Sequence, residues 1–286
     1  RLFGGLLKGF GAGRFPDLLK RLTNGHLVAA VAISEEEYAQ SLPGFSTVAW
    51  REENFFSVSG AKVFVTNAPI ADYIAVATSV DGNPAFVLIR PDQSGVTVGP
   101  RLETLGYNGL AVASLKLNEV KVSEKMVVGP FEDRKCLDFL RQTQDMLLVI
   151  ASVGLMQRTL AEAKKHADSH QRGGKPIFHW QEIRFKIAEM LTLTQTAQLL
   201  CYRAAWMCSV SDQEAGTLVH CAKVFATEAS ERVASMAVQI LAGNGYLRGN
   251  PVERAYREAK YATLAGTTTE IARMSIADEL LKRYQV

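Results

Sequence analysis

The sequence predicts an α+β fold, in which a central antiparallel β-domain is followed by a C-terminal four-helix bundle. Between residues 27 and 128, short apolar runs alternate with turn signals, as is typical of strands. From 129 to 286, apolar residues recur at spacings of three and four, as is typical of packed helices. Of the 286 residues, 48% are hydrophobic and 21% are charged, which indicates a globular chain and excludes a disordered or collagen-like one.

Residues 1–26 are interpreted as a helical remnant that leads into the sheet. They combine Leu, Gly and Phe with scattered Lys and Arg but have no small-residue cleavage site, which argues against a signal peptide. The glycine-rich stretch 9–13 lacks the preceding strand and following helix of a dinucleotide fingerprint. We therefore expect a flexible loop there and no Rossmann site.

The β-domain is expected to be a sandwich or a barrel. Its turn signals include Asp81-Gly82, which lies between two apolar runs and indicates a hairpin. The strands are expected at the apolar runs 27–33, 55–65, 73–78, 85–89 and 112–117.

The helical half is expected to hold four helices, around 147–155, 183–191 and 218–240 and from about 269 to 284. In the third of these, Lys223, Glu228 and Glu231 lie off the apolar stripe, so we expect them on a polar face. The glycines at 243 and 245 follow this helix and are expected to form its C-cap. The stripe consists of Leu218, Ala222, Phe225, Ala229, Val233, Met236 and Ile240.

Charge and cysteine usage exclude several classes of protein. With 32 Lys and Arg against 29 Asp and Glu, the net charge is only +3, which argues against a protein built around nucleic acid or anionic membrane. No apolar run reaches the ~18 residues of a membrane span. We expect a reducing compartment, the cytoplasm or the mitochondrial matrix of a eukaryote. The cysteines Cys136, Cys201, Cys208 and Cys221 lack metal-ligand spacing, so no metal site is expected.

An ordered set of motifs resembles the acyl-CoA dehydrogenase family over nearly the whole chain. The strongest is Gln239-Ile-Leu-Ala-Gly-Asn-Gly-Tyr246, followed by Pro251-Val-Glu and Tyr256-Arg-Glu-Ala-Lys260. Earlier matches are Ala32-Ile-Ser-Glu35, Gly60-Ala-Lys-Val-Phe-Val-Thr-Asn67, Gly154-Leu-Met-Gln157 and Gly174-Lys-Pro with Gln181.

This resemblance implies an N-terminal helical domain, largely absent here, before the β-domain and the bundle. It also implies FAD as cofactor, a homo-oligomer (dimer or tetramer) and an electron-accepting flavoprotein as a partner. The substrate would be an acyl thioester, on coenzyme A or on an acyl carrier protein. The reaction would remove one hydrogen each from Cα and Cβ of the acyl group.

The resemblance also assigns the residues that would hold FAD. Ser34, Phe64 and Thr66 would contact the isoalloxazine, where a hydroxyl can bond the ring edge and an aromatic side chain can pack on its face. Gln239 and Gly243 would meet the adenosine part of the cofactor of a neighbouring subunit.

Two further residues, Thr268 and Glu270, would complete the FAD site where the last helix begins, and Thr268 is also an N-cap candidate. The sequence departs from the family pattern nearby. His170 stands where the family has an arginine for the FAD pyrophosphate, and Arg172 is the expected substitute. Gln40 replaces a family serine, and Glu36 replaces the proline of a Thr-Glu-Pro motif.

Histidines near the expected pyrophosphate site leave two interpretations open. His170 and His179 flank the Gly173-Gly174 loop, where they would either take part in ligand binding or be ordinary surface residues. His166 and His220 are subject to the same two interpretations.

The catalytic base is the main departure. The family usually abstracts the α-proton with a glutamate at the position that Gly266 occupies here, or Ala265 if the alignment shifts by one residue. Some members place it on the first bundle helix, where this chain has Gln144, a poor base. Asp145 is adjacent, in place of the usual arginine, and is our candidate base; a solvated or helix-start carboxylate is the alternative.

Three functions remain open from the sequence. The first is an FAD-dependent acyl-thioester dehydrogenase with an atypical base. The second is a catalytically silent structural or partner subunit of an acyl-CoA dehydrogenase complex. The third is flavin monooxygenation on the same fold.

Overall fold

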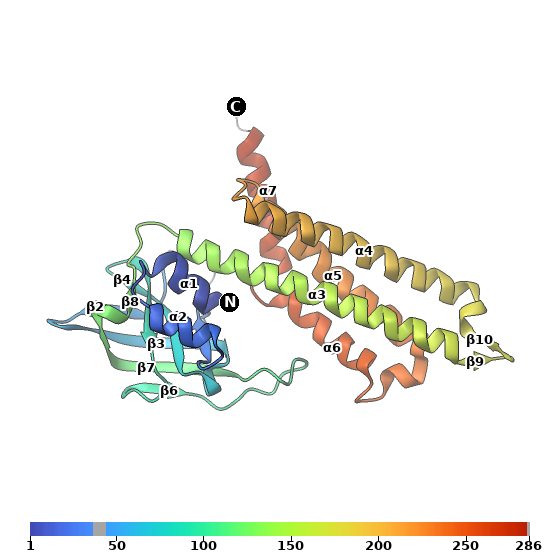
Figure 1. Ribbon diagram of the computed structural model, residues 1–286, viewed down its shortest axis with the longest axis horizontal. Coiled ribbons are helices and arrows are strands. Elements are labelled where there is room, and N and C mark those ends of the chain that lie inside the picture. The colour runs from blue at the N-terminus through green and yellow to red at the C-terminus, as the bar shows by residue number, and fades with distance from the viewer. Residues whose placement is uncertain (37–43, 285–286) are drawn as a thin grey trace. The chain divides into compact units, whose positions relative to one another are not determined.

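The structure, a computed structural model, describes residues 1–36 and 44–284 (Figure 1). Its contacts divide the chain into two compact units, Arg1–Leu140 and Arg141–Val286. The division falls within the long helix α3 (Lys135–Ser169). The predicted domain boundaries after residues 26 and 128 are not tested by this division into two units and stay predictions.

The first unit is built on an eight-stranded sheet with two short helices, α1 (Leu2–Phe10) and α2 (Pro16–Thr23). The strand order is β6-β7-β3-β2-β4-β5-β8, with β1 paired to β4. The strands are β1 (Ala29–Ala32), β2 (Val48–Arg51), β3 (Phe55–Thr66), β4 (Tyr73–Val80), β5 (Asn83–Ile89), β6 (Val96–Val98), β7 (Val112–Ser123) and β8 (Val127–Val128).

The sheet is mainly antiparallel, as predicted, but it also contains two parallel pairings that were not predicted. β1 and β2 each pair with β4 in parallel, while the other pairings are antiparallel. The five predicted strands are all present. β2, β6 and β8 were not predicted because they span four, three and two residues, too short to show an alternating pattern. The hairpin prediction is confirmed: Asp81 and Gly82 have φ of +50° and +82° and join β4 to β5.

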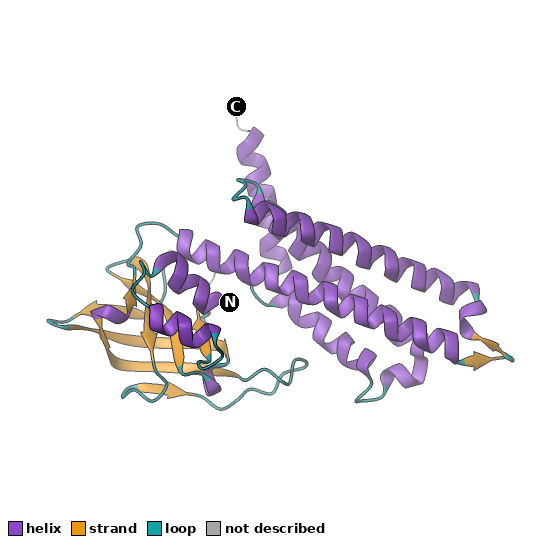
Figure 2. Cartoon of the chain, in the orientation of Figure 1, coloured by secondary structure: helices purple, strands orange, loops and turns teal. Residues whose placement is uncertain are grey.

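Both faces of β4 and β5 are buried, which explains their nearly continuous apolar runs. On one face, Phe86 and Leu88 pack with Leu6 and Leu7 of α1 and with Leu140 of α3. The helices α1 and α2 cover this face in Figure 2. The other face packs within the sheet itself, around Ile74, Val87, Leu115 and Val122. The glycine-rich stretch forms the end of α1 and a turn into α2, in keeping with the absence of a phosphate loop.

The second unit is a helical bundle (Figure 2). Besides α3, its long helices are α4 (Gln181–Ser209), α5 (Ala215–Leu241), α6 (Pro251–Leu264) and α7 (Thr269–Tyr284). Among the described residues, this half of the chain therefore holds five α-helices, one more than predicted. The additional helix is α6, whose residues were considered only as part of a motif and not as a helix. A small hairpin of β9 (Gln171–Arg172) and β10 (Lys175–Pro176) connects α3 to α4.

The helix α5 is central and packs against α4, α6 and α7. Its predicted apolar stripe is confirmed, with Ala222, Val233 and Ile240 in the core. The predicted position of Lys223 is wrong, because this residue is fully buried and does not lie on a polar face. The C-cap prediction is also wrong: Ala242, at φ +49°, ends α5, and residues 242–246 continue as a 3₁₀ helix.

The helix α3 is long and apolar enough, by length and composition, to qualify as a membrane span, which the sequence analysis did not anticipate. Its apolar face packs against the bundle core through Val149, Val153 and Met156. The core helix of a globular bundle passes the same test. Cys136 and Cys201 are buried and all four cysteines are free, and burial raises the pKa of the Cys136 thiol to about 12.

Gly60 tests the packing of β3 against the segment before β2. A Cβ at Gly60 would lie 2.6 Å from Thr47 Cα, and its φ is +150°. We expect Gly60→Ala to lower the free energy of unfolding in urea by about 2–3 kcal/mol. Gly82→Ala is the control, since its φ is +82° but a Cβ would meet nothing within 4 Å. An equal loss in both variants would show that the contact with Thr47 is unimportant.

Candidate functional site

Ser34 and Phe64 lie on two segments of the first unit that a backbone hydrogen bond joins. Ser34 follows β1, and its carbonyl oxygen accepts a hydrogen bond from Val63 N at 2.9 Å. A register shift between Lys62 and Val65 interrupts the β3–β7 pairing, and Phe64 adopts φ +54° within it. The phenyl ring is 71% exposed. A strained, outward-facing aromatic residue of this kind is typical of a ligand platform.

Thr66 ends β3 two residues later and is half-buried. It pairs with Val112 in the β3–β7 ladder. The structure thus places the three predicted isoalloxazine contacts, Ser34, Phe64 and Thr66, on two neighbouring segments of the same unit. Gln40 lies outside the described residues.

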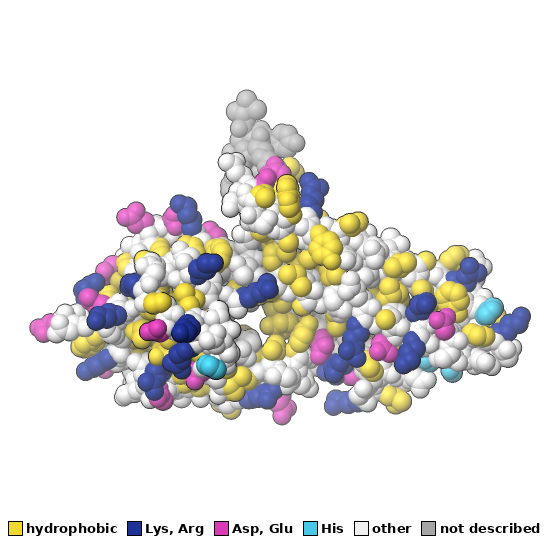
Figure 3. Space-filling view, in the orientation of Figure 1, with side chains coloured by type: hydrophobic (Ala, Val, Ile, Leu, Met, Phe, Trp, Pro, Cys, Tyr) yellow, Lys and Arg dark blue, Asp and Glu magenta, His cyan; other side chains and the backbone are white. Residues whose placement is uncertain are grey.

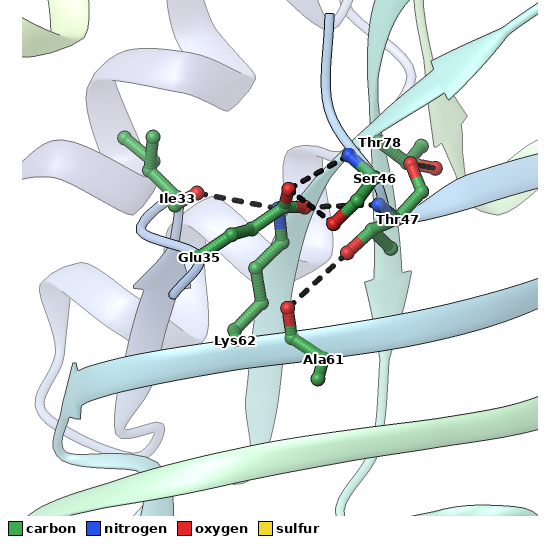
Figure 4. A network of polar contacts seen from close by, with 7 residues as sticks. All are labelled: Ile33, Glu35, Ser46, Thr47, Ala61, Lys62 and Thr78. Atoms are coloured by element: carbon green, nitrogen blue, oxygen red, sulfur yellow. Dashed lines mark hydrogen bonds and ion pairs between the residues drawn. The ribbon is translucent and has the colours of Figure 1, made fainter. Parts of the chain in front are cut away.

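A buried ion pair anchors these two segments (Figure 4). Glu35 Oε1 accepts hydrogen bonds from Lys62 Nζ at 2.6 Å and from Thr47 N at 3.0 Å. Its other oxygen accepts from Ser46 N at 2.7 Å and Ser46 Oγ at 2.6 Å. Lys62 Nζ also donates to Ile33 O at 3.2 Å. The strand end that carries Ser34 is therefore tied directly to the strand that carries Phe64.

Burial and pairing act in opposite directions on the two charges of this pair. Burial favours neutral Glu35, but the hydrogen bonds from Lys62, Ser46 and Thr47 outweigh it and lower the pKa of Glu35 to about 2. For Lys62 burial dominates and lowers its pKa to about 8, although Glu35 opposes the shift. The ammonium also lies 4.3 Å from the centre of the Phe45 ring. The sequence alone did not indicate this ion pair, because Glu35 and Lys62 were considered only as parts of two separate motifs.

A second group of residues surrounds a cavity of about 720 Å³ within the bundle. It includes the predicted cofactor residues Arg172 and Gln239, which lie 67 positions apart in sequence. Gly243 is one residue beyond the lining residue Ala242, and a Cβ there would meet nothing within 4 Å. The lining comprises His166, His170, Arg172, Ile177, Trp180, Gln181, Glu182, Ile183, Lys186, Gln239, Ile240, Leu241 and Ala242.

The cavity is rich in groups that can carry positive charge. His166 and His170 stack with ring centres 4.8 Å apart, and burial together with His170 lowers the pKa of His166. Lys186 pairs with Glu182 at 2.5 Å, which leaves Arg172 and the two imidazoles facing a single paired carboxylate. This lining suits an anionic ligand with a flat ring that can stack on Trp180. Of the two interpretations for the histidines, the cavity favours ligand binding for His166 and His170, whereas His179 is exposed and does not line it.

A third group lies where α6 turns into α7. Asp145 is fully buried on α3, and its Oδ1 accepts a hydrogen bond from Thr267 N at 2.9 Å. Lys223 of α5 is also fully buried, with Nζ 3.7 Å from Asp145 Oδ1 and 2.6 Å from Ala265 O. Burial lowers the pKa of Lys223 to about 8, although Asp145 opposes the shift. This is the environment of a structural ion pair, and the role of Asp145 as the catalytic base stays a prediction.

The start of α7 carries the last two predicted residues. Ile271 N lies 3.4 Å from Thr268 Oγ1, so the N-cap prediction for Thr268 is confirmed. Glu270 is in the first turn, and hydrogen bonds from its own backbone N–H and from Thr268 lower its pKa. Neither residue lines the cavity of Arg172 and Gln239. Both instead adjoin the turn that is held by Asp145.

Comparison with known proteins identifies the family. Residues 30–120 match the profile of the acyl-CoA dehydrogenase middle domain, and residues 142–281 match that of the acyl-CoA dehydrogenase C-terminal domain. The chain belongs to the acyl-CoA dehydrogenase family. This confirms the resemblance drawn from the motifs, and with it the class of flavoproteins that use FAD.

Curated relatives agree with this assignment. The 3-(aryl)acrylate reductase of Clostridium sporogenes is 30% identical over 274 residues, which cover 92% of this chain and 71% of that protein. The cyclohexane-1-carbonyl-CoA dehydrogenase of Geobacter metallireducens is 31% identical, with coverage of 93% and 71%. The short-chain specific acyl-CoA dehydrogenase of mouse mitochondria is 31% identical, with coverage of 99% and 70%.

Solved structures confirm the fold. Butyryl-CoA dehydrogenase from Megasphaera elsdenii superposes with a TM-score of 0.93 at 24% identity, over 98% of this chain and 75% of that one. The prolyl acyl carrier protein oxidase AnaB superposes with a TM-score of 0.90 at 25% identity, over 96% and 74%. The predicted central β-domain followed by a helical domain is thus correct.

The residues present fit FAD at both of its ends. The exposed Phe64 ring and the neighbouring Ser34 hydroxyl provide a flat apolar face and a polar edge. The cavity of Arg172 and Gln239 provides cationic groups and an amide, which suit a diphosphate and a nucleoside. His170, which stands at the position of the family arginine, and Arg172, its expected substitute, both line this cavity.

The Glu35–Lys62 pair makes a specific contribution to acid stability. The pKa of Glu35 falls from 4.5 to about 2 on folding, so the unfolded chain binds the proton more tightly and stability is lost as pH falls through this window. The loss should approach about 3 kcal/mol. Glu35→Gln should remove this pH dependence and lower stability at neutral pH, because Lys62 remains buried without a charged partner.

Urea unfolding at a series of pH values between neutrality and the acid limit measures this difference. Glu36→Gln is the matched control, because Glu36 is the next residue along the chain and is exposed. A difference in stability between the native chain and Glu35→Gln that does not change with pH would contradict the ion-pair interpretation.

Proposed function

We propose that this protein is an FAD-dependent oxidoreductase that acts on an acyl thioester. The observation that carries the proposal is the separate clustering of residues suited to the two ends of FAD. Ser34 and Phe64 form one cluster, and Arg172 and Gln239 share a cavity in the other. Neither cluster follows from one motif, because each joins segments that are distant in sequence.

On the sheet side, the chain orients the flavin ring. Phe64 packs on the ring face, and the hydroxyls of Ser34 and Thr66 bond its edge. The Glu35–Lys62 pair holds the two segments in register, so the platform is formed before the ligand arrives. FAD supplies the redox chemistry when bound, by accepting a hydride from the substrate.

On the bundle side, the cavity holds the diphosphate and the adenosine. Arg172 and His170 face the diphosphate, and Gln239 bonds the adenosine with Gly243 allowing close backbone approach. This contact is proposed to lie between subunits, so that the cavity of one chain would receive the cofactor of its neighbour. Thr268 and Glu270, which do not line this cavity, are proposed to contact FAD separately, at the start of α7.

The substrate is proposed to be an acyl group on coenzyme A or on an acyl carrier protein. Cyclohexane-1-carbonyl-CoA dehydrogenase and the prolyl acyl carrier protein oxidase are, by name, examples of the two carriers among the similar proteins. The caffeyl-CoA reductase–Etf complex subunit of Acetobacterium woodii, 31% identical, supports an electron-transferring flavoprotein as partner. A cytoplasmic or matrix location is the corresponding proposal for where the chain acts.

The chain is also proposed to form a homo-oligomer through α4. On this helix Leu199, Tyr202 and Trp206 are 70%, 62% and 62% exposed and lie on one face, with Phe185 four turns earlier at 63%. Apolar side chains gather along α4 in Figure 3. An exposed apolar strip of this kind marks an interface, and a second copy would also bring one cofactor to the neighbouring cavity.

A catalytically silent partner subunit is the second candidate function. The observation that favours it is Gly266, which has no side chain to take a proton where the family usually has a glutamate. Anaerobic titration with acyl-CoA and acyl-carrier-protein panels separates the candidates. Flavin bleaching by any substrate supports the enzyme, whereas a colourless protein that co-purifies with an active homologue supports the subunit. Product that forms only with oxygen would indicate monooxygenation instead.

Gln239 tests the cofactor assignment in the bundle. We expect Gln239→Ala to lower FAD affinity about fivefold to tenfold, because one amide hydrogen bond to the ligand is worth on the order of 1 kcal/mol. The FAD-to-protein ratio after dialysis measures this loss. Gln157→Ala is the control, because Gln157 is an exposed glutamine of α3 that does not line the cavity. Unchanged FAD content in Gln239→Ala would show that the assignment is wrong.

The α4 strip tests the oligomer. We expect Leu199→Lys combined with Trp206→Lys to shift the protein to a smaller assembly in light scattering, because two charges would be buried at the interface. Lys substitutions at the exposed polar positions Gln157 and Asp168 of α3 are the control. A native assembly that persists in the α4 variant would place the interface elsewhere.

A further inference from the structure

The turn between α6 and α7 is held by two buried charges from other helices. Asp145 Oδ1 accepts from Thr267 N at 2.9 Å, and Lys223 Nζ donates to Ala265 O at 2.6 Å. Both side chains have no exposed surface. Residue 266, the middle of this turn, is therefore enclosed between one contact on each side.

Gly266 leaves no space for a side chain in this arrangement. Its φ is +67°, and a Cβ would lie 2.4 Å from Asp145 Oδ1 and 3.1 Å from Leu148 Cδ1. Real Cβ atoms essentially never approach another atom to less than 3.0 Å. The carboxylate of Asp145 thus fills the volume in which a side chain at 266 would begin.

The balance of buried charges also disfavours a carboxylate at residue 266. Lys223 is the cation paired with Asp145, at 3.7 Å, and its Nζ reaches the backbone of the same turn. A second carboxylate at 266 would be buried beside Asp145 with one ammonium for both, and an unpaired buried charge is strongly destabilising. Asp145 Oδ2 and Thr267 Oγ1 have no hydrogen-bond partner among the described residues, so the turn offers no further donor to either.

We infer that residues 145 and 266 form one exclusive site with room for a single carboxylate, and that Asp145 is a positioning residue that closes it. The carboxylate points at the backbone of Thr267 and holds the turn, and the turn contributes no proton acceptor of its own. This deepens the proposed function and rests on it for its catalytic consequence: the acceptor for the acyl α-proton must come from another segment or chain.

A double-mutant cycle between Asp145→Ala and Gly266→Glu tests the inference through stability. Each change is expected to lower the Tm when made alone. Asp145→Ala leaves Lys223 unpaired, and Gly266→Glu forces a second carboxylate into the turn, with a loss of more than about 5 °C. In the Asp145→Ala background, Gly266→Glu should lower the Tm much less, because it returns one carboxylate to Lys223 and only the backbone strain at φ +67° remains.

Backbone strain is controlled by Gly25→Ala, at φ +73° with nothing within 4 Å of a Cβ. This variant should lose the same amount of Tm with and without Asp145→Ala. A Gly266→Glu loss that is equal in both backgrounds would overturn the inference, since independent sites add. The stability cycle does not depend on FAD, so a protein that shows the coupling but binds no flavin would refute the proposed function alone.

Exchange of the α-hydrogens of butyryl-CoA in D₂O supplies a catalytic readout. We expect the double variant to exchange faster than the native protein, because its carboxylate starts from 266. If the native protein exchanges and Asp145→Asn abolishes exchange with little change in Tm, Asp145 is itself the base and the positioning role is wrong. Faster exchange in the double variant that is absent from Asp145→Ala would support the exclusive site.

Discussion

A buried lysine–carboxylate pair stabilises the critical backbone in each unit of this protein. In the sheet unit, Lys62 and Glu35 join the end of β1 to β3. In the bundle, Lys223 and Asp145 join α5 and α3 to the turn before α7. Removing one partner of such a pair leaves the other charge buried, at a cost of about 3–5 kcal/mol. Each pair therefore connects separate segments of its unit, and its loss would destabilise that connection.

This connection has a different consequence in each unit. Lys62 and Glu35 lie behind the strand ends, so Ser34 and Phe64 can remain exposed and still be positioned for a flat ligand. Lys223 and Asp145 lie inside the turn itself, and the carboxylate fills the space where a functional side chain would start. The same kind of interaction thus supports a binding surface in one unit and closes a reactive position in the other.

Family membership and the glycine at 266 together determine which functions are candidates for this chain. Family membership supplies an oxidoreductase fold with FAD, and the clusters at Phe64 and at Gln239 retain groups that suit this cofactor. The two candidate functions differ in whether another group replaces the carboxylate that Gly266 cannot supply. A protein that binds flavin without a base at 266 either takes the proton with a group from elsewhere or serves an active partner, and both outcomes follow from the same local substitution.

The sequence by itself determined the order of the domains, the five main strands, the Asp81-Gly82 hairpin and the family. These depend on local periodicity, turn chemistry and ordered motifs, which are visible along the chain. It also located Gly266 and Asp145 as departures. Periodicity could not place Lys223, which it assigned to a polar face, because pairing with a residue 78 positions away decides its burial.

Only the tertiary structure decided how the distant groups combine. It brought Lys62 to Glu35, Arg172 to the cavity of Gln239, and Asp145 to the backbone of Thr267. It also showed that β1 and β2 run parallel to β4, which short strands do not reveal. The reason is that a buried charge is tolerated only beside its partner, and partners distant in sequence are selected by the fold and not by local pattern.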